Sequence, residues 1–227
     1  MKAFLMAVGA VVVLSASASP ISATTLADLL AGGSITVGDK TFDNFSNGSI
    51  SCVGSCTFTS NANFADITVT GGTFNGLIGL NFTGGIGVGT SSSLDIFFEY
   101  DVTSTWASIT DVHMDMNGSI LPAGGNFFVS ISEDVYDGAN IVASIQVDDD
   151  PIGDKTYTAD VIGGPYQSLH VIKDILLFTS SDTEGILSGF KQTWSQIPEP
   201  ASVMLLGTAF SALAFFGRRR LAGKVNG

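Results

Sequence analysis

Alternation of apolar and polar residues with a period of two constrains the fold of this chain more than any other feature. Residues 94–103 are the clearest case, because Leu94, Ile96, Phe98 and Tyr100 fall on one face and mostly polar residues on the other. Such alternation is typical of a β-strand with one buried face. The pattern recurs at intervals of about 8–15 residues, with turn-forming residues between the repeats, and predicts about ten to twelve strands.

These strands predict an all-β domain, because no long helical pattern interrupts them and a βαβ arrangement would need one. We expect an antiparallel two-sheet sandwich of jelly-roll type, with a β-barrel as the alternative. A short helix should precede the strands, since Thr25 and Asp28 have capping-box spacing and Gly32-Gly33 follows. The inward rows further along the chain begin at Val112, Phe127, Ile141, Tyr157 and Ile186.

Several local features complete this prediction. Asn47-Gly48, Asn117-Gly118 and Asp137-Gly138 are expected to form turns, because these pairs favour tight turns. Residues 84–93 are rich in glycine and serine and predict a loop. Residues 169–178 are more continuously apolar and predict a strand buried on both faces.

The N-terminal 23 residues have the composition of a secretory signal peptide. Lys2 is followed by an apolar run and then by small residues. Ala16-Ser17-Ala18 fits a cleavage site, and cleavage after Ala23 is the slightly favoured alternative. The sequence therefore divides into a signal peptide at 1–23, a domain at 24–196 and a C-terminal segment at 197–227.

The C-terminal segment contains three parts in a fixed order. Ile197-Pro198-Glu199-Pro200 is followed by an uncharged run at 201–216 and then by Arg218, Arg219 and Arg220. An uncharged run beside a basic cluster predicts a transmembrane helix whose basic end stays in the cytoplasm.

This order resembles the PEP-CTERM sorting signal of Gram-negative bacteria. The resemblance implies export through the inner membrane, transient anchoring by the C-terminal helix and processing by an exosortase, a membrane protease. It also implies release at the cell surface, or into the biofilm matrix of bacteria that produce exopolysaccharide. Exosortase is thus the implied partner, and an exopolysaccharide a second one. The residues implied in recognition are Pro198, Glu199, Pro200 and the three arginines.

The charge of the chain is unevenly distributed. The whole chain has a formal charge of −12, but residues 24–196 contain four lysines, no arginine and 20 acids, which gives −16. A surface with so few cations repels nucleic-acid phosphates, so nucleic acid is excluded as a partner. The acidic surface is suited to a soluble exported protein.

Cys52 and Cys56 are the two cysteines, and they flank a glycine at position 54. Export through an oxidising compartment predicts a structural disulfide that closes a tight hairpin. Reactive thiols or a metal site are less favoured, because further ligands are missing.

Two acidic patterns are candidates for a metal site, and calcium is the only cofactor that they suggest. Asp148, Asp149, Asp150 and Asp154 could supply oxygen ligands, but their spacing does not match an EF-hand, and a solvated turn is favoured. Asp111, His113 and Asp115 share one strand face, where ordinary solvent-facing side chains are the favoured interpretation. We therefore predict no resident metal.

Nothing in the sequence indicates catalysis. No G-x-S-x-G elbow surrounds a serine, and the glycine-rich stretch at 84–89 lacks the following helix that a phosphate site needs. We predict a non-enzymatic surface or matrix protein. The alternative is a carbohydrate-binding module or a polysaccharide-acting enzyme, in which Trp106 is the best candidate for stacking on a sugar. Tyr136, Tyr166 and Trp194 are weaker ones. The sequons at Asn44, Asn47, Asn81 and Asn117 are explained by chance as well as by glycosylation.

Overall fold

The computed structural model describes residues 23–56, 63–105, 107–121, 127–149, 157–180 and 183–198. The predicted signal peptide up to residue 22 lies outside these ranges, as do the segment from Glu199 onward and Trp106. Among the described residues, no helix has the length and apolar character needed to cross a membrane.

Twelve strands and two short helices make up the described chain. In order, the elements are β1 (Ala23–Thr25), α1 (Leu26–Leu30), β2 (Ile35–Val37), β3 (Lys40–Val53), the 3₁₀ helix η1 (Phe64–Asp66), β4 (Thr68–Phe74), β5 (Leu77–Val88), β6 (Ser93–Ser104), β7 (Ala107–Leu121), β8 (Phe127–Asp137), β9 (Asn140–Asp149), β10 (Tyr157–Tyr166), β11 (Ser168–Thr179) and β12 (Glu184–Pro198).

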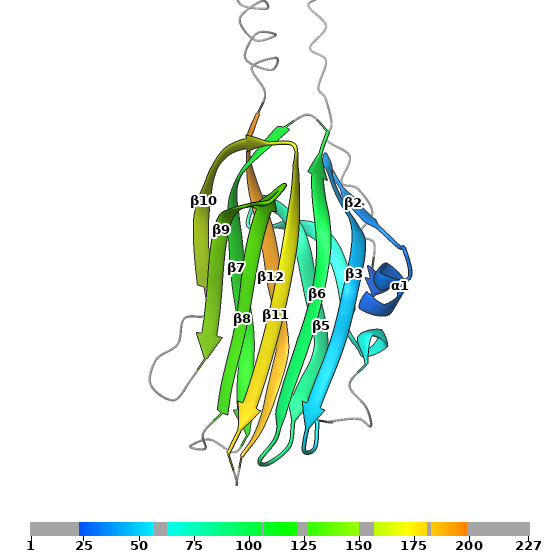
Figure 1. Ribbon diagram of the computed structural model, residues 1–227, viewed down its shortest axis with the longest axis vertical. Coiled ribbons are helices and arrows are strands. Elements are labelled where there is room, and N and C mark those ends of the chain that lie inside the picture. The colour runs from blue at the N-terminus through cyan, green and yellow to red at the C-terminus, as the bar shows by residue number, and fades with distance from the viewer. Residues whose placement is uncertain are drawn as a thin grey trace, which may run out of the picture.

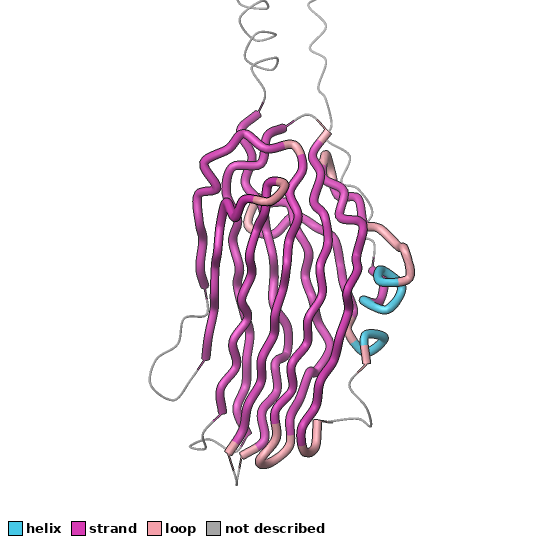
Figure 2. The backbone as a smooth tube through the Cα atoms, in the orientation of Figure 1, coloured by secondary structure: helices cyan, strands magenta, loops and turns pink. Residues whose placement is uncertain are grey.

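The strands form two six-stranded antiparallel sheets that pack face to face along the long axis of the molecule (Figure 1). Sheet A has the order β1-β4-β5-β12-β7-β10, and sheet B has the order β2-β3-β6-β11-β8-β9. The predicted all-β, two-sheet sandwich is therefore confirmed. Strands dominate the backbone, with both helices on one side of it (Figure 2).

The pairing of β5 to β12 is nested. β5 pairs with β12, β6 with β11, β7 with β10 and β8 with β9, and successive pairs alternate between the two sheets. This eight-stranded connectivity is that of a jelly roll. The remaining strands, β1 to β4, extend the sheets at the edge next to β5 and β6.

The core lies between the sheets and is built from the alternating rows. On β6, the inward residues Leu94, Ile96, Phe98 and Tyr100 are at most 1% exposed, as the sequence predicts. Aromatic rings fill the middle of the sandwich, where Phe82 stacks on Phe190 with 4.5 Å between ring centroids. Burial of these rows on both sheets supplies the main driving force for folding.

The helix prediction is confirmed in detail. The Thr25 side chain caps α1 by accepting a hydrogen bond from the Asp28 amide at 3.1 Å, and the Asp28 carboxylate accepts one in return from the Thr25 amide at 3.3 Å. Leu26 and Leu29 are buried, so this five-residue helix is held by docking on the sandwich.

Several local predictions were wrong. The row that begins at Tyr157 faces solvent, with Tyr157 58% and Val161 71% exposed. Asn47-Gly48 lies inside β3 and Asn117-Gly118 inside β7, so neither pair ends a strand. β5 continues to Val88, so only residues 89–92 of the predicted loop at 84–93 lie between strands. β11 alternates between buried and open positions, so residues 169–178 are buried on one face only. The turn at Asp137-Gly138 is confirmed, with Gly138 at a φ of 58°.

Candidate functional site

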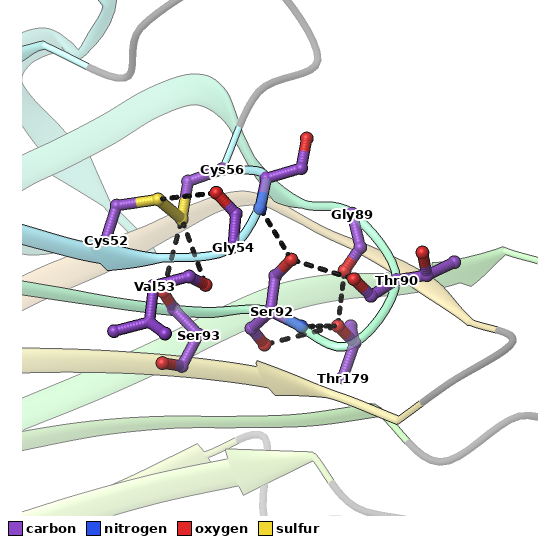
Figure 3. Close-up of a disulfide and its surroundings, with 10 residues drawn as sticks. Cys52, Val53, Gly54, Cys56, Gly89, Thr90, Ser92, Ser93 and Thr179 are labelled. Carbon is purple, nitrogen blue, oxygen red and sulfur yellow. Dashed lines mark hydrogen bonds between the residues drawn. A yellow bond between two sulfur atoms is a disulfide. The ribbon is translucent and has the colours of Figure 1, made fainter.

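The predicted disulfide between Cys52 and Cys56 is present at the end of β3 (Figure 3). Gly54 lies between the cysteines at a φ of 89°, and a Cβ there would lie 2.5 Å from the Ser92 hydroxyl oxygen. The Ser55 amide donates to that same oxygen at 2.8 Å. Thus the disulfide turn is fastened to the segment that leads into β6, and glycine is required at position 54.

The outer face of sheet B carries a cluster of acids and amides around one histidine. His170 Nδ1 lies 2.7 Å from Asp101 Oδ1, and its Nε2 lies 3.7 Å from Glu99 Oε2. The Tyr136 ring lies beside His170, with 6.4 Å between centroids. We call Asp101, Glu99, His170 and Tyr136, together with the two asparagines described next, the carboxylate cluster.

Asn44 and Asn47 reach this cluster because β3 is irregular. Both have a φ of 54°, a left-handed conformation that asparagine tolerates better than most residues, and the pairing of β3 with β6 shifts beside each of them. Asn44 Nδ2 donates to Asp101 Oδ2 at 2.9 Å, and Asn47 Nδ2 donates to Glu99 Oε2 at 2.7 Å. These two sequon amides are therefore engaged with carboxylates.

Carboxylates that crowd one another on this face have raised pKa values. Burial and the opposed Asp101 raise the pKa of Asp43, and the Asp43 Oδ1 atom is buried with no hydrogen-bond partner among the described residues. Burial and the hydrogen-bonded Asp95 likewise raise the pKa of Asp174. Asp43 and Asp174 on this face therefore bind protons more readily than isolated aspartates do.

Asp174→Asn is expected to raise the Tm of the full chain at pH 7 by about 1–3 °C, a small effect because solvent screens repulsion between exposed carboxylates. The folded-state pKa of Asp174 lies above its unfolded value, so its repulsion is fully present above the folded pKa. That repulsion is relieved as the pH falls through the folded pKa toward 3.8, the ordinary pKa of an aspartate. The stabilisation by asparagine should shrink over the same range in thermal melts. Asp160→Asn, at an exposed site on β10, is the control, and a gain for Asp174→Asn that does not depend on pH would contradict this explanation.

On the outer face of sheet A, His113 is the centre of a chain of polar side chains. Its Nδ1 lies 2.9 Å from the Tyr157 hydroxyl oxygen, and its Nε2 lies 2.8 Å from Ser195 Oγ. Ser195 Oγ donates to Asp111 Oδ2 at 2.9 Å. The single serine proton is thus directed at the carboxylate, so His113 Nε2 carries the proton that binds Ser195. This order differs from that of a catalytic triad, in which the histidine lies between acid and serine.

The two acidic patterns weighed as metal sites are not gathered into one. His113 uses both ring nitrogens on hydroxyl groups, and Asp115 lies 3.8 Å from Lys191 Nζ. Asp148 is half-buried on β9, which runs on to Asp149, while Asp150 and Asp154 lie outside the described residues. Within the part of the chain that the structure describes, no three His, Cys, Asp or Glu residues lie together as metal ligands.

The stacking candidates have different outcomes. Trp194 is 1% exposed in the core, so the suggestion that it offers a stacking face is wrong. Tyr166 is half-buried and packs against the core, and Tyr136 is half-buried in the carboxylate cluster. Trp106 lies outside the described residues.

Sequence reasoning missed an ion pair inside the sandwich. Lys173 on β11 and Glu133 on β8 contact each other with side chains that are 0% exposed. Lys173 Nζ also donates to Gln192 Oε1 at 2.8 Å and lies 5.2 Å from the centre of the Phe190 ring. Burial lowers the pKa of Lys173 and raises that of Glu133, while their mutual attraction acts against both shifts.

The alternation of apolar and polar residues in β8 and β11 could have indicated that both members of this pair are buried. Glu133 continues the inward row of Ile131 and Val135, and Lys173 continues that of Val171 and Ile175. The position of each residue in the alternating pattern is enough to place its side chain on the inward face of its strand.

The fold and these sites define an all-β, two-sheet domain with polar outer faces and a buried ion pair. At the C-terminal end, residues 196–220 match the PEP-CTERM protein-sorting motif. The chain therefore carries the sorting motif that its C-terminal sequence resembles. The match overlaps β12, which ends at Pro198 and pairs there with Ala107 of β7.

Other comparisons give weaker results. In the comparison with curated proteins, no match to this chain was found. Among solved structures, TmCBM61 in complex with beta-1,4-galactotriose is 13% identical, with a TM-score of 0.30 over 66% of this chain and 90% of that one. The enzymatically active domain of bacteriophage CBA120 tailspike protein 4 is 17% identical, with a TM-score of 0.28 over 67% and 20% of the two chains. A structure of carbohydrate-binding modules from the beta-sandwich super family is 11% identical, with a TM-score of 0.22 over 70% and 58%. These similarities are too weak to assign a fold family or a ligand.

Proposed function

We propose that this chain is an exported, exosortase-processed protein of the bacterial cell surface or extracellular matrix. In this proposal the sandwich neither catalyses a reaction nor needs a cofactor, and the C-terminal segment is recognised and removed. The PEP-CTERM match at residues 196–220 is the observation that carries the proposal. An exopolysaccharide of the matrix is the partner that the sorting signal suggests.

The position of the motif relative to the fold supports removal of the segment without damage to the domain. Strand pairing of β12 extends to Pro198, the first proline of the motif. Within the part of β12 whose burial is described, up to Ser195, Trp194 is the last buried residue. Cleavage beyond Pro198 would therefore leave these core side chains in place.

Glu199→Ala in the full chain, expressed in a host that contains an exosortase, is expected to block processing. The mature cell-associated protein should then retain peptides that contain Met204, whereas the unchanged chain should lose them. The reason is that the acid between the two prolines belongs to the recognised motif. Peptide mapping by mass spectrometry measures the difference.

The matched control is Glu184→Ala, which removes an exposed acid at the other end of β12 and should be processed normally. Retention of Met204 in the unchanged mature protein would refute the proposal. So would normal processing of the Glu199→Ala protein.

A carbohydrate-binding role is the second candidate, and the carboxylate cluster favours it. Carboxylate oxygens and asparagine amides are suited to the hydroxyl groups of a sugar, since together they accept and donate hydrogen bonds. Tyr136 adds an aromatic ring beside His170. This grouping on an open sheet face, rather than likeness of fold, is the reason to test sugar binding.

Purified full-length protein is expected to be retarded in a native gel that contains exopolysaccharide from the producing bacterium. Tyr136→Ala should reduce the retardation several-fold, because it removes the ring from the cluster. Tyr157→Ala, which removes an exposed tyrosine from sheet A instead, should have little effect. Migration unchanged by the polysaccharide would rule out this second candidate.

A further inference from the structure

We propose that Lys173 and Gln192 become joined by an amide cross-link inside the sandwich, formed with Glu133 as the proton-transfer group. The two linked side chains come from β11 in sheet B and β12 in sheet A. The bond would therefore tie one sheet to the other. This modification is independent of the proposed sorting and of sugar binding.

The three reacting groups are already assembled. Lys173 Nζ lies 2.8 Å from Gln192 Oε1, the oxygen bonded to the carbon that would be attacked. The same Nζ contacts the Glu133 carboxylate. A nucleophile, an amide and an acid–base group in mutual contact are the parts that amide exchange needs. Attack requires Nζ to move from its hydrogen bond with Oε1 to the carbon bonded to that oxygen.

The surroundings favour an uncharged lysine, which is the nucleophilic form. Lys173 and Gln192 are 0% exposed and Glu133 is 1% exposed. Met114 Sδ lies 3.5 Å from Lys173 Nζ, and the Phe190 ring covers the amine from another side. Burial disfavours both members of a charged pair, and the opposite pKa shifts of Lys173 and Glu133 favour transfer of the proton to the carboxylate. Exclusion of water also suppresses hydrolysis of the amide.

The step balances without an oxidant or a co-reactant. The step begins with neutral Lys173 and protonated Glu133. The Lys173 Nζ lone pair attacks the side-chain carbonyl carbon of Gln192, and Glu133 gives its proton to Gln192 Nε2. Glu133 then takes a proton from Nζ, the bond between Nε2 and the carbonyl carbon breaks, and ammonia leaves. Gln192 Nε2 has no hydrogen-bond partner among the described residues, so nothing there holds the leaving group back.

The alternative is a buried ion pair that stays non-covalent. The two readings differ in covalent structure, so the mass of the native protein distinguishes them. A link between positions 19 residues apart would also restrict the unfolded chain, as a disulfide does.

The test is a tryptic peptide map of the full chain after reduction of the disulfide. Trypsin cuts after lysine, and an acylated Lys173 resists it. If the link forms, residues 156–191 should appear as one uncut segment joined to the peptide that begins at Gln192, lighter than the sum of the two peptides by one ammonia. The free peptide 156–173 should be missing. In the Lys173→Arg protein the branched peptide should be absent.

Three results would overturn the proposal, and the first needs no variant. Recovery of the free peptide 156–173 from the native, folded protein would show that no link forms. A link from Lys173 to Glu133 with loss of one water would show that Gln192 is not the acceptor. A Glu133→Gln protein that folds, as judged by near-ultraviolet circular dichroism, and is still linked as fully as the unchanged chain would remove Glu133 from the reaction.

Discussion

Lys173→Met is expected to lower the free energy of unfolding by about 3–5 kcal/mol, because it leaves the Glu133 carboxylate buried without its partner. Both side chains are fully buried, so water cannot replace the lost contact. The loss is measured by urea unfolding of the full chain, as the midpoint shift at constant slope. Any cross-link to Gln192 would be lost as well, which acts in the same direction.

Lys191→Met is the matched control for this prediction. Lys191 is partly exposed on β12 and lies 3.8 Å from Asp115, which is more exposed still. A surface pair of this kind contributes about 0–1 kcal/mol. The double change Lys173→Met with Glu133→Leu should recover most of the stability, because it removes both buried polar partners and leaves neither unpaired. Equal losses for the two lysine variants would contradict the assigned role of the buried pair.

Phe190→Ala is expected to cost about 3–5 kcal/mol, the range for removal of a large aromatic side chain from a packed core. Phe190 is 1% exposed, stacks on Phe82 at an interplanar angle of 10° and covers the Lys173 amine. Truncation leaves a cavity at the centre of the sandwich and removes the ring that covers Lys173 Nζ. Thermal and urea unfolding of the full chain both report the loss.

Phe178→Ala provides the comparison for the same residue type. Phe178 is 51% exposed on the outer face of sheet B, where truncation leaves no internal cavity. Its cost should stay near the ±0.5 kcal/mol typical of surface changes, given as an order of magnitude. If the two phenylalanine variants unfold at the same urea concentration, the assignment of Phe190 to the core is wrong.

The period of two was enough to predict the architecture, since a strand that places Leu94, Ile96 and Phe98 on one face must bury that face. It was not enough to place the strand ends. Asn47-Gly48 is a strong turn signal, yet Asn47 adopts its left-handed conformation within β3, and its side-chain amide donates a hydrogen bond to Glu99. The same residue types serve turns and bulges, and the choice between them depends on partner strands far away in sequence.

Irregular pairing also explains the error along β12. The predicted row took Ile186, Ser188 and Phe190 to share one face. Pairing with β5 and β7 shifts between Leu187 and Gly189, so Leu187 and Phe190 both point into the core. An inserted residue of this kind changes which face each side chain takes, and the local sequence does not reveal it.

The contacts of the outer faces could not be predicted at all. His113 and His170 are each in contact with residues more than 40 positions away, and only the order of strands in the sheets brings those residues together. The disulfide could be predicted, because its two cysteines lie within one turn of chain.

The position of β12 has a mechanical consequence. This strand lies between β5 and β7, and its C-terminal end enters the sorting motif. If the C-terminal segment tethers the protein during export, as we propose, a pull transmitted through Pro198 would act on β12, which is paired with neighbours on both of its edges. Hydrogen bonds between antiparallel strands run perpendicular to the strands. A pull along the strand therefore loads many of them in shear at the same time, and they do not open one after another. In this proposal the domain is held through a strand paired on both edges, and not through an edge strand.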